Sequence, residues 1–227
     1  VIVGLGGVRT LSAAKAVAMA GTADAQIDDY LSGMQPKTDP LPFVALPTTC
    51  RDPFLLTNEL LLTDSRDRTA RILRAQPGIT RAVIFDPKLS ATLPPKFTAT
   101  TLMDTLLAAV EGYLSSRANF ISDTFFLRAF ELIGKTIDAL RDDPQDLRVR
   151  VNASMAGLLV AMGLTLSKTG VGSALAYAIN GRFMVPKSWV ASIMLPRVLE
   201  FCIGVAAEKL SVLAGYLGEN TAEATPV

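Results

Sequence analysis

The order of apolar and polar residues along the chain predicts strands in its first part and helices in the rest. Short apolar runs rich in β-branched residues predict buried strands at residues 1–7, 43–46 and 82–85. Two further runs, residues 57–63 and 69–75, flank the turn-forming segment 64–67 and predict a hairpin. We expect the first run to be a fully buried parallel strand that ends in a tight glycine turn.

Helical patterns lie between the strands and dominate the second half of the chain. An alanine-rich helix is predicted at residues 12–19 and a short amphipathic one at residues 25–31. The Leu93-Pro94-Pro95 segment ends the strand pattern, and beyond it helices are predicted at residues 99–116, 121–140, 145–166, 171–180, 187–196 and 198–216. The predicted fold class is therefore α/β plus all-α, with an α/β domain in residues 1–95, an all-helical domain in residues 96–227 and any active cleft between them.

We expect the rest of the chain to be arranged around residues 102–113. Leu102, Leu106 and Val110 recur at the spacing that places apolar side chains on one helical face. Asp104 has two readings. It forms a capping box with Thr101, or it is what remains of a metal site whose second ligand would lie one turn later, where the chain has Ala108.

Composition argues against several classes of partner. The 227 residues, half of them hydrophobic, are enough to bury a sizeable core. With 22 Lys and Arg against 21 Asp and Glu, the chain has no strong field for nucleic acid or an anionic membrane, so we expect neither partner. The run 155–166 is too short to span a membrane and charges and prolines interrupt residues 185–206, which predicts a soluble protein. Residues 1–7 lack the charged segment of a signal peptide.

The cysteines and the lack of histidine limit the catalytic and metal-binding chemistry open to the chain. Cys50 and Cys202 lie far apart in apolar sequence, so we predict buried, unbridged thiols and a cytoplasmic location. The chain contains no histidine, which removes the commonest general base and the commonest transition-metal ligand together.

A strand, a glycine turn and a helix follow one another at the start of the chain. Gly6 and Gly7 precede the first predicted helix, whose N-terminus would offer free N–H groups and partial positive charge to a phosphate. A glycine pair after a strand also occurs for steric reasons alone. A phosphate site and a plain turn therefore both remain open.

Four segments occur in an order and at spacings that few families share. They are Val1 to Lys15 with its glycine turn, Ala45 to Thr49, Phe85 to Pro95, and Met103 to Tyr113. In these segments the chain resembles the iron-containing (group III) alcohol dehydrogenases of the dehydroquinate-synthase-like superfamily. The resemblance implies a Rossmann-like nucleotide-binding domain followed by a helical domain, NAD or NADP in the cleft, an Fe²⁺ or Zn²⁺ ion, a small alcohol or aldehyde substrate and a homo-oligomer. It also implies that the N-terminal part of the first domain and the C-terminal part of the second lie outside this chain.

The resemblance assigns cofactor contacts, and the sequence departs from some of them. The residues that would bind the nucleotide are Gly6, Gly7, Arg9, Thr48 and Thr49. Val8 stands where the family has a third glycine, and residues 51–55 replace a glycine-containing run. The loops that would contact the cofactor therefore differ from the family's pattern. Arg9 and Arg51 either pair with the cofactor phosphates or are solvated at the rim of the cleft.

The family holds its metal with one Asp and three His. By resemblance Asp104 takes the Asp position, the His positions fall on Ala108, Ser173 and Lys187, and a further family histidine near the site falls on Tyr177. Ala108 has no donor atom, Ser173 is a poor ligand and Lys187 repels a cation. We therefore predict that no family-type metal binds.

Three functions remain open at this point. The first is a dehydrogenase-like protein that has lost its metal chemistry and is inactive or much altered, a possible pseudoenzyme. The second is a metal-independent NAD(P) oxidoreductase whose candidate catalytic residues, Lys187 and Asp104, face each other across the old site, with Lys187 as a fixed positive charge for an alkoxide-like oxygen. The same two residues would also make a plain ion pair. The third is a non-enzymatic domain that binds an anionic small molecule through Arg9, Arg51 and Lys187.

Overall fold

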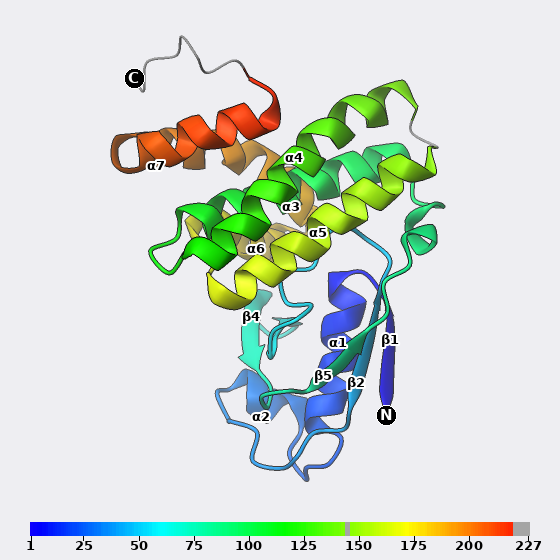
Figure 1. Cartoon of the computed structure of the whole chain (residues 1–227). Helices are drawn as coiled ribbons and strands as arrows, with labels where there is room; N and C mark the ends of the chain where they lie inside the picture. Colours follow the sequence, from blue (N-terminus) through cyan, green and yellow to red (C-terminus); the bar gives the residue numbers. More distant parts are fainter. Residues whose placement is uncertain (144–145, 220–227) are drawn as a thin grey trace.

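A computed structural model describes residues 1–143 and 146–219 of the chain. A part that contains the strands and a part made of long helices lie one above the other (Figure 1). The chain leaves the strand-containing part through the short 3₁₀ helix η1 (Pro87–Ser90), and the first long helix begins at Pro95. The change in element type falls where the proline segment predicts it. The division into independent domains at residues 95 and 96 stays a prediction.

The first half contains a parallel sheet and a hairpin. The parallel strands have the order β1-β2-β5, and their bounds are β1 (Ile2–Gly6), β2 (Phe43–Pro47) and β5 (Thr80–Val83). The antiparallel pair β3 (Glu59–Asp64) and β4 (Thr69–Arg74) confirms the predicted hairpin. Helix α1 (Val8–Ala20) packs against β1 and β2, and the short α2 (Ile27–Leu31) follows it.

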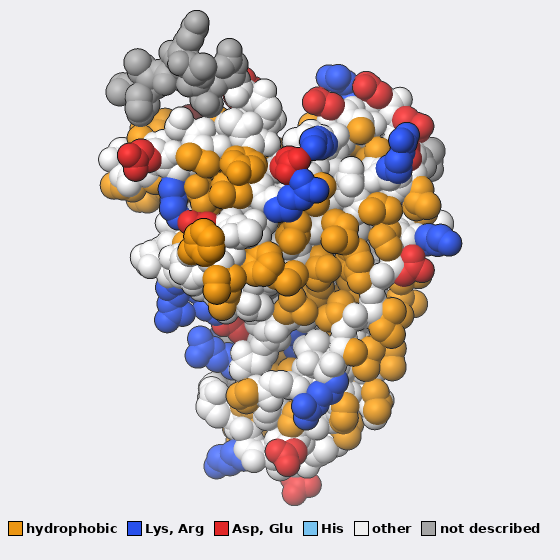
Figure 2. Space-filling view, in the orientation of Figure 1, with side chains coloured by type: hydrophobic (Ala, Val, Ile, Leu, Met, Phe, Trp, Pro, Cys, Tyr) orange, Lys and Arg blue, Asp and Glu red, His pale blue; other side chains and the backbone are white. Residues whose placement is uncertain are grey.

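The prediction of a fully buried first strand is wrong. Strand β1 pairs with β2 in parallel as expected, but it lies at the edge of the sheet. Gly4 faces α1, whereas Val3 and Leu5 point the other way and are 62% and 55% exposed. On the face seen in Figure 2, hydrophobic side chains gather over the helical part and continue down toward this edge of the sheet.

Five helices make up the described part of the second half. They are α3 (Pro95–Leu114), α4 (Phe120–Asp142), α5 (Leu147–Leu166), α6 (Val171–Phe183) and α7 (Lys187–Leu217). Helix α3 starts four residues before the predicted position because Pro95 occupies its first turn, where a missing N–H does no harm. The predicted capping box is therefore wrong. Thr101 lies inside the helix, and its hydroxyl donates to the carbonyl of Phe97.

The last two predicted helices correspond to α7, but their boundary is misplaced. Helix α7 continues through Pro196 and is divided by a kink at Ala206, where the backbone leaves helical geometry. Helices α5 and α7 are long and apolar enough to cross a membrane by length and composition alone, which is weak evidence, since core helices pass the same test. Helix α5 packs against α4 and α3. The absence of a membrane partner stays a prediction.

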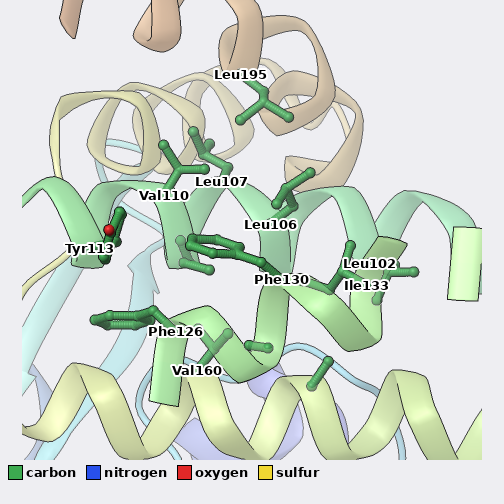
Figure 3. Packing of buried hydrophobic residues seen from close by; sticks show 14 of the residues in the cluster. Leu102, Leu106, Leu107, Val110, Tyr113, Phe126, Phe130, Ile133, Val160 and Leu195 are labelled. Carbon is green, nitrogen blue, oxygen red and sulfur yellow. The ribbon is translucent and has the colours of Figure 1, made fainter. Parts of the chain in front are cut away.

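Helix α3 lies at the centre of the helical core, as its apolar spacing predicts. Leu102, Leu107 and Ala109 have no exposed surface at all. Figure 3 shows the cluster between α3, Phe126 and Phe130 of α4, and neighbouring helices. Asp104 is equally inaccessible, so a carboxylate lies in the most buried helix of the protein.

The segment between β2 and β3 is held from two sides. On one side the ammonium of Lys15 in α1 donates to the carbonyls of Phe54, Thr57 and Glu59 at 2.7, 2.9 and 3.2 Å. On the other side the Cys50 carbonyl accepts a hydrogen bond of 2.9 Å from the Thr105 hydroxyl of α3. The segment that carries Arg51 is thus fixed to both halves of the chain.

Helix α5 approaches the same segment backbone to backbone at Gly157. A Cβ atom at this position would lie 2.0 Å from the Cys50 carbonyl oxygen. Only glycine permits so close an approach. Both cysteines are free, and Cys50 is buried as predicted. The predicted burial of Cys202 is wrong, because it is half-buried.

Gly157→Ala is expected to destabilise the protein, because its methyl group must push α5 away from the Cys50 carbonyl. The expected loss is about 1–3 kcal/mol in the free energy of unfolding, measured by urea denaturation. Gly204→Ala in α7 is the matched control, since a Cβ there meets nothing within 4 Å. Equal effects of the two substitutions would contradict the close approach at Gly157.

Lys15 predicts a pH dependence of stability. Burial lowers the pKa of its ammonium to about 8, against the opposing influence of Asp52 and Glu59. In the unfolded chain the pKa returns to about 10.4, so between these values the unfolded state binds more protons. The free energy of unfolding should rise from about pH 8 and level off above about pH 10.5. Lys15→Met should reduce that slope in urea titrations at several pH values, and an unchanged slope would contradict this origin.

Candidate functional site

The ends of β1 and β2 and the helical part enclose a cavity of about 360 Å³. The Thr48 amide donates to the Gly6 carbonyl at 3.0 Å, which joins the two loops at the carboxyl ends of these strands. Gly6 has a φ of +153°, and a Cβ at Gly7 would lie 3.3 Å from Thr49 Cγ2. The structure therefore brings the five predicted nucleotide-binding residues to one edge of the sheet. Arg9 is exposed there and donates to the Asn180 side chain at 3.0 Å.

A buried carboxylate shared by two cations lies beside this cavity. One oxygen of Asp104 in α3 pairs with the ammonium of Lys187 at the start of α7. Its other oxygen pairs with the guanidinium of Arg51, which follows β2. The side chains are 0%, 5% and 11% exposed, in the order Asp104, Lys187 and Arg51. The prediction that Lys187 and Asp104 face each other is correct in geometry, and the alternative of a solvated Arg51 is wrong.

Tyr177 of α6 completes the cluster. Its hydroxyl accepts a hydrogen bond of 3.0 Å from Arg51, and its ring centre lies 4.6 Å from the Lys187 ammonium and 5.4 Å from the Arg51 guanidinium carbon. The ring face attracts both cations. Asn180, the partner of Arg9, lies one turn further along the same helix, so Arg9, Arg51 and Lys187 all reach one face of α6.

Burial shapes the protonation of the cluster. Burial, together with the repelling Arg51 charge, lowers the pKa of Lys187 to about 8, and Asp104 opposes this shift. Lys187 is therefore mostly charged at neutral pH. Burial also raises the pKa of the Tyr177 hydroxyl, which keeps its proton throughout the physiological range.

The residues at the family's ligand positions do not fit a transition-metal ion. Asp104 already pairs through both oxygens, and Ala108 has no donor atom. The Ser173 hydroxyl is buried and finds no hydrogen-bond partner among residues 1–143 and 146–219. Within those same ranges, no group of three His, Cys, Asp or Glu side chains could hold a metal. Four-coordinate sites in proteins need more donors than one carboxylate.

The start of helix α1 lies on the nucleotide side of the cavity. Gly7, Val8 and Thr10 line the cavity there, and a helix N-terminus carries partial positive charge that suits an anion. Val8 is buried with Phe54, Leu61 and Tyr177 in a small apolar cluster. The side chain that stands at the position of the family's third glycine therefore packs among apolar residues.

Sequence reasoning missed two features of the site. It assigned Arg51 to cofactor phosphates, to an anionic ligand or to solvent, whereas the structure pairs Arg51 with Asp104. It also gave no role to Asn180. The signal that could have found Arg51 is its place after the Thr48-Thr49-Cys50 loop, at the strand end that faces α3. The pairing itself joins residues far apart in the sequence and has no local signature.

Two family models match the chain. The model described as iron-containing alcohol dehydrogenase matches residues 1–87, and the model for the C-terminal region of the Fe-containing alcohol dehydrogenase family matches residues 98–226. The second model alone covers more than half of the chain.

Curated proteins and solved structures agree with these matches. The 1,3-propanediol dehydrogenase of Citrobacter freundii is 29% identical over 222 residues, 97% of this chain and 57% of that protein. Alcohol dehydrogenase 4 of Saccharomyces cerevisiae is 29% identical over 88% of this chain and 52% of its own length. A solved 1,3-propanediol oxidoreductase superposes with a TM-score of 0.91 at 27% identity, over 99% of this chain and 59% of that one. An alcohol dehydrogenase from Oenococcus oeni gives the same TM-score at 25% identity, over 99% of this chain and 58% of that one. The chain spans less than two thirds of the length of each.

Asp104→Asn is expected to destabilise the fold strongly, because it leaves two buried cations without their shared counter-charge. The expected loss in the free energy of unfolding is about 3–5 kcal/mol by urea denaturation. Asp123→Asn is the control. It breaks the half-buried pair with Lys209, 3.0 Å long, and should lose about 1 kcal/mol or less.

Addition of Lys187→Met to Asp104→Asn should restore part of the lost stability, since it removes one of the two uncompensated charges. If Asp104→Asn were no more harmful than Asp123→Asn, the buried pairing would be wrong.

Proposed function

The chain belongs to the iron-containing alcohol dehydrogenase family, and from this premise we propose that it is a member in which two protein cations replace the catalytic metal. The observation that carries the proposal is the pairing of both Asp104 oxygens with Lys187 and Arg51. Metal-assisted oxidation of alcohols is then lost, and the protein is inactive or much altered as a dehydrogenase.

Charge balance supports this replacement. A divalent ion bound by Asp104 would bring two positive charges next to one carboxylate. Lys187 and Arg51 together bring the same two charges to the same carboxylate. To enter, a metal ion would have to expel both cations or leave like charges in contact in a buried place, and both are unfavourable. Lys187 and Arg51 thus supply the positive charge that the metal ion would bring, although the histidine ligands of the family are missing.

The family's cofactor chemistry is hydride transfer with a nicotinamide nucleotide. In this chain, Gly6, Gly7, Arg9, Thr48 and Thr49 remain the residues that would hold NAD or NADP. The α1 N-terminus and the Arg9 guanidinium suit its phosphates. Three apolar-cluster residues, Val8, Leu61 and Tyr177, line the same cavity, with Val8 where the family has a glycine. We propose weak binding of the nucleotide or none.

A second candidate is a metal-independent oxidoreductase. The observation that favours it is that Lys187, Arg51 and Tyr177 all line the cavity. Their fixed positive charge and hydroxyl could stabilise a developing alkoxide oxygen of an alcohol or aldehyde. In this reading Lys187 and Asp104 are catalytic. In the first they are structural. For both candidates we propose a homo-oligomer, on the ground of the resemblance. We also propose a cytoplasmic location, on the ground of the unbridged cysteines.

The test joins metal content to activity. The purified chain is incubated with Fe²⁺ or Zn²⁺ and dialysed, its metal content is measured by inductively coupled plasma mass spectrometry, and turnover is followed with NAD⁺ and NADP⁺ over a panel of alcohols that includes 1,3-propanediol. The proposal predicts metal content far below one ion per chain and no metal-dependent turnover. The Citrobacter freundii 1,3-propanediol dehydrogenase, treated in parallel, is the positive control.

The outcomes separate the candidates. One tightly held ion per chain with robust turnover contradicts the first proposal. Turnover that survives chelators and disappears in Lys187→Met supports the second. Because Asp104 stays paired with Arg51 in that variant, we expect it to fold, and thermal unfolding checks this.

A further inference from the structure

The cavity beside Asp104 is lined by buried cations and by a partly apolar, exposed rim. Arg51 and Lys187 are the buried cations, whereas the apolar Phe97 and Met184 are 44% and 68% exposed, and Arg9 is also exposed at the rim. We propose that this cavity binds an aliphatic carboxylate, with the carboxylate on the buried cations and the hydrocarbon chain along the mouth. The inference rests on the proposed function in one respect only, that protein cations and no metal ion occupy the site.

The lining of the cavity is positive, because the nearby carboxylates lie behind it. Asp104 is shared by Lys187 and Arg51. Asp52 interacts with Lys15 as well as Arg51, and Glu111 acts on Lys187 but accepts from backbone amides at the start of α6. The described residues that line the cavity include the cations Arg51 and Lys187 and no carboxylate. A cavity lined by charge of one sign attracts an ion of the other sign.

Further groups add to the same field. Arg9 at the rim donates to the neutral side chain of Asn180, which does not offset its charge. Two helices start at the cavity wall, α1 at Val8 and α7 at Lys187, and each brings partial positive charge. The Tyr177 hydroxyl accepts its hydrogen bond from Arg51, so its own proton is free to be donated to an anion.

The size and lining favour a carboxylate over a phosphate or a nucleotide. Arg51 and Lys187 already share Asp104, so they suit a monoanion better than a phosphate monoester, which carries about −1.5 to −2 at neutral pH. The volume of about 360 Å³ lies near the lower end of small-ligand pockets. Phe97, Met184 and Pro186 offer apolar surface for a hydrocarbon chain, which an inorganic ion would leave uncovered.

The experiment measures binding of octanoate to the metal-free chain by isothermal titration calorimetry. Acetate has the carboxylate without the long hydrocarbon tail, and 1-octanol has the hydrocarbon tail without the charge. Inorganic phosphate is the competing type of anion. We expect saturable octanoate binding at least tenfold tighter than that of each of the three. No saturable octanoate binding, or equal affinity for 1-octanol or phosphate, overturns the proposal.

Variants locate the site. Lys187→Met leaves Asp104 neutralised by Arg51 and should weaken octanoate binding at least tenfold. Lys168→Met, which breaks a surface pair with Glu59, is the control and should leave binding unchanged. Arg9→Met is the second test variant, because Arg9 is exposed and its loss should weaken binding without loss of the fold. If both Lys187→Met and Arg9→Met bind octanoate like the unmodified chain, the assigned site is wrong. One tightly held metal ion per chain would refute the proposed function. Failure of octanoate to bind at this site would refute only the proposed ligand.

Discussion

The structure depends on one buried carboxylate that three segments of the chain share. Asp104 comes from the central helix α3, Arg51 from the segment after β2, and Lys187 from the first turn of α7. Desolvation of the three charges is offset only if each cation keeps its place against the carboxylate. The Thr105–Cys50 hydrogen bond and the contact of Gly157 with Cys50 hold the Arg51 segment there. The strand-containing part and the helical part are thus joined at the site itself.

In the function that we propose, the same arrangement replaces a metal site by an anion site. In the family to which the chain belongs, a carboxylate and imidazoles surround an added cation. Here the cations are built into the protein, and the total positive charge exceeds that of the carboxylate. Tyr177, at a position where the family has a histidine, contributes a ring face to the cations and a hydroxyl that keeps its proton. The cavity is therefore lined by the cations Arg51 and Lys187, on which the proposed anion binding depends.

The spacing of apolar residues predicts an element correctly where its packing depends on the local sequence. It fails where contacts with distant segments determine the bounds or burial of an element. The hairpin, the strands β1 and β2 and the apolar face of α3 follow from spacing and turn residues. The buried strand predicted at residues 82–85 is wrong in position and burial, because β5 runs from Thr80 to Val83 and Ile84 is 52% exposed. The start of α3 was misplaced because Pro95 also suits the first turn of a helix. The break in α7 lies at Ala206, a residue type with high helix propensity, so no local signal marks it. The exposed side of β1 depends on what covers the sheet. The Arg51–Asp104 pair could not be predicted, because nothing in either neighbourhood specifies the other.

The most direct test of the account is anomalous diffraction from crystals grown with Zn²⁺ or Fe²⁺, with data collected on both sides of the metal absorption edge. The account predicts no anomalous peak near Asp104, with the Lys187 ammonium and the Arg51 guanidinium both within hydrogen-bond distance of its carboxylate. An anomalous peak bound by Asp104, with Lys187 turned away, would contradict it.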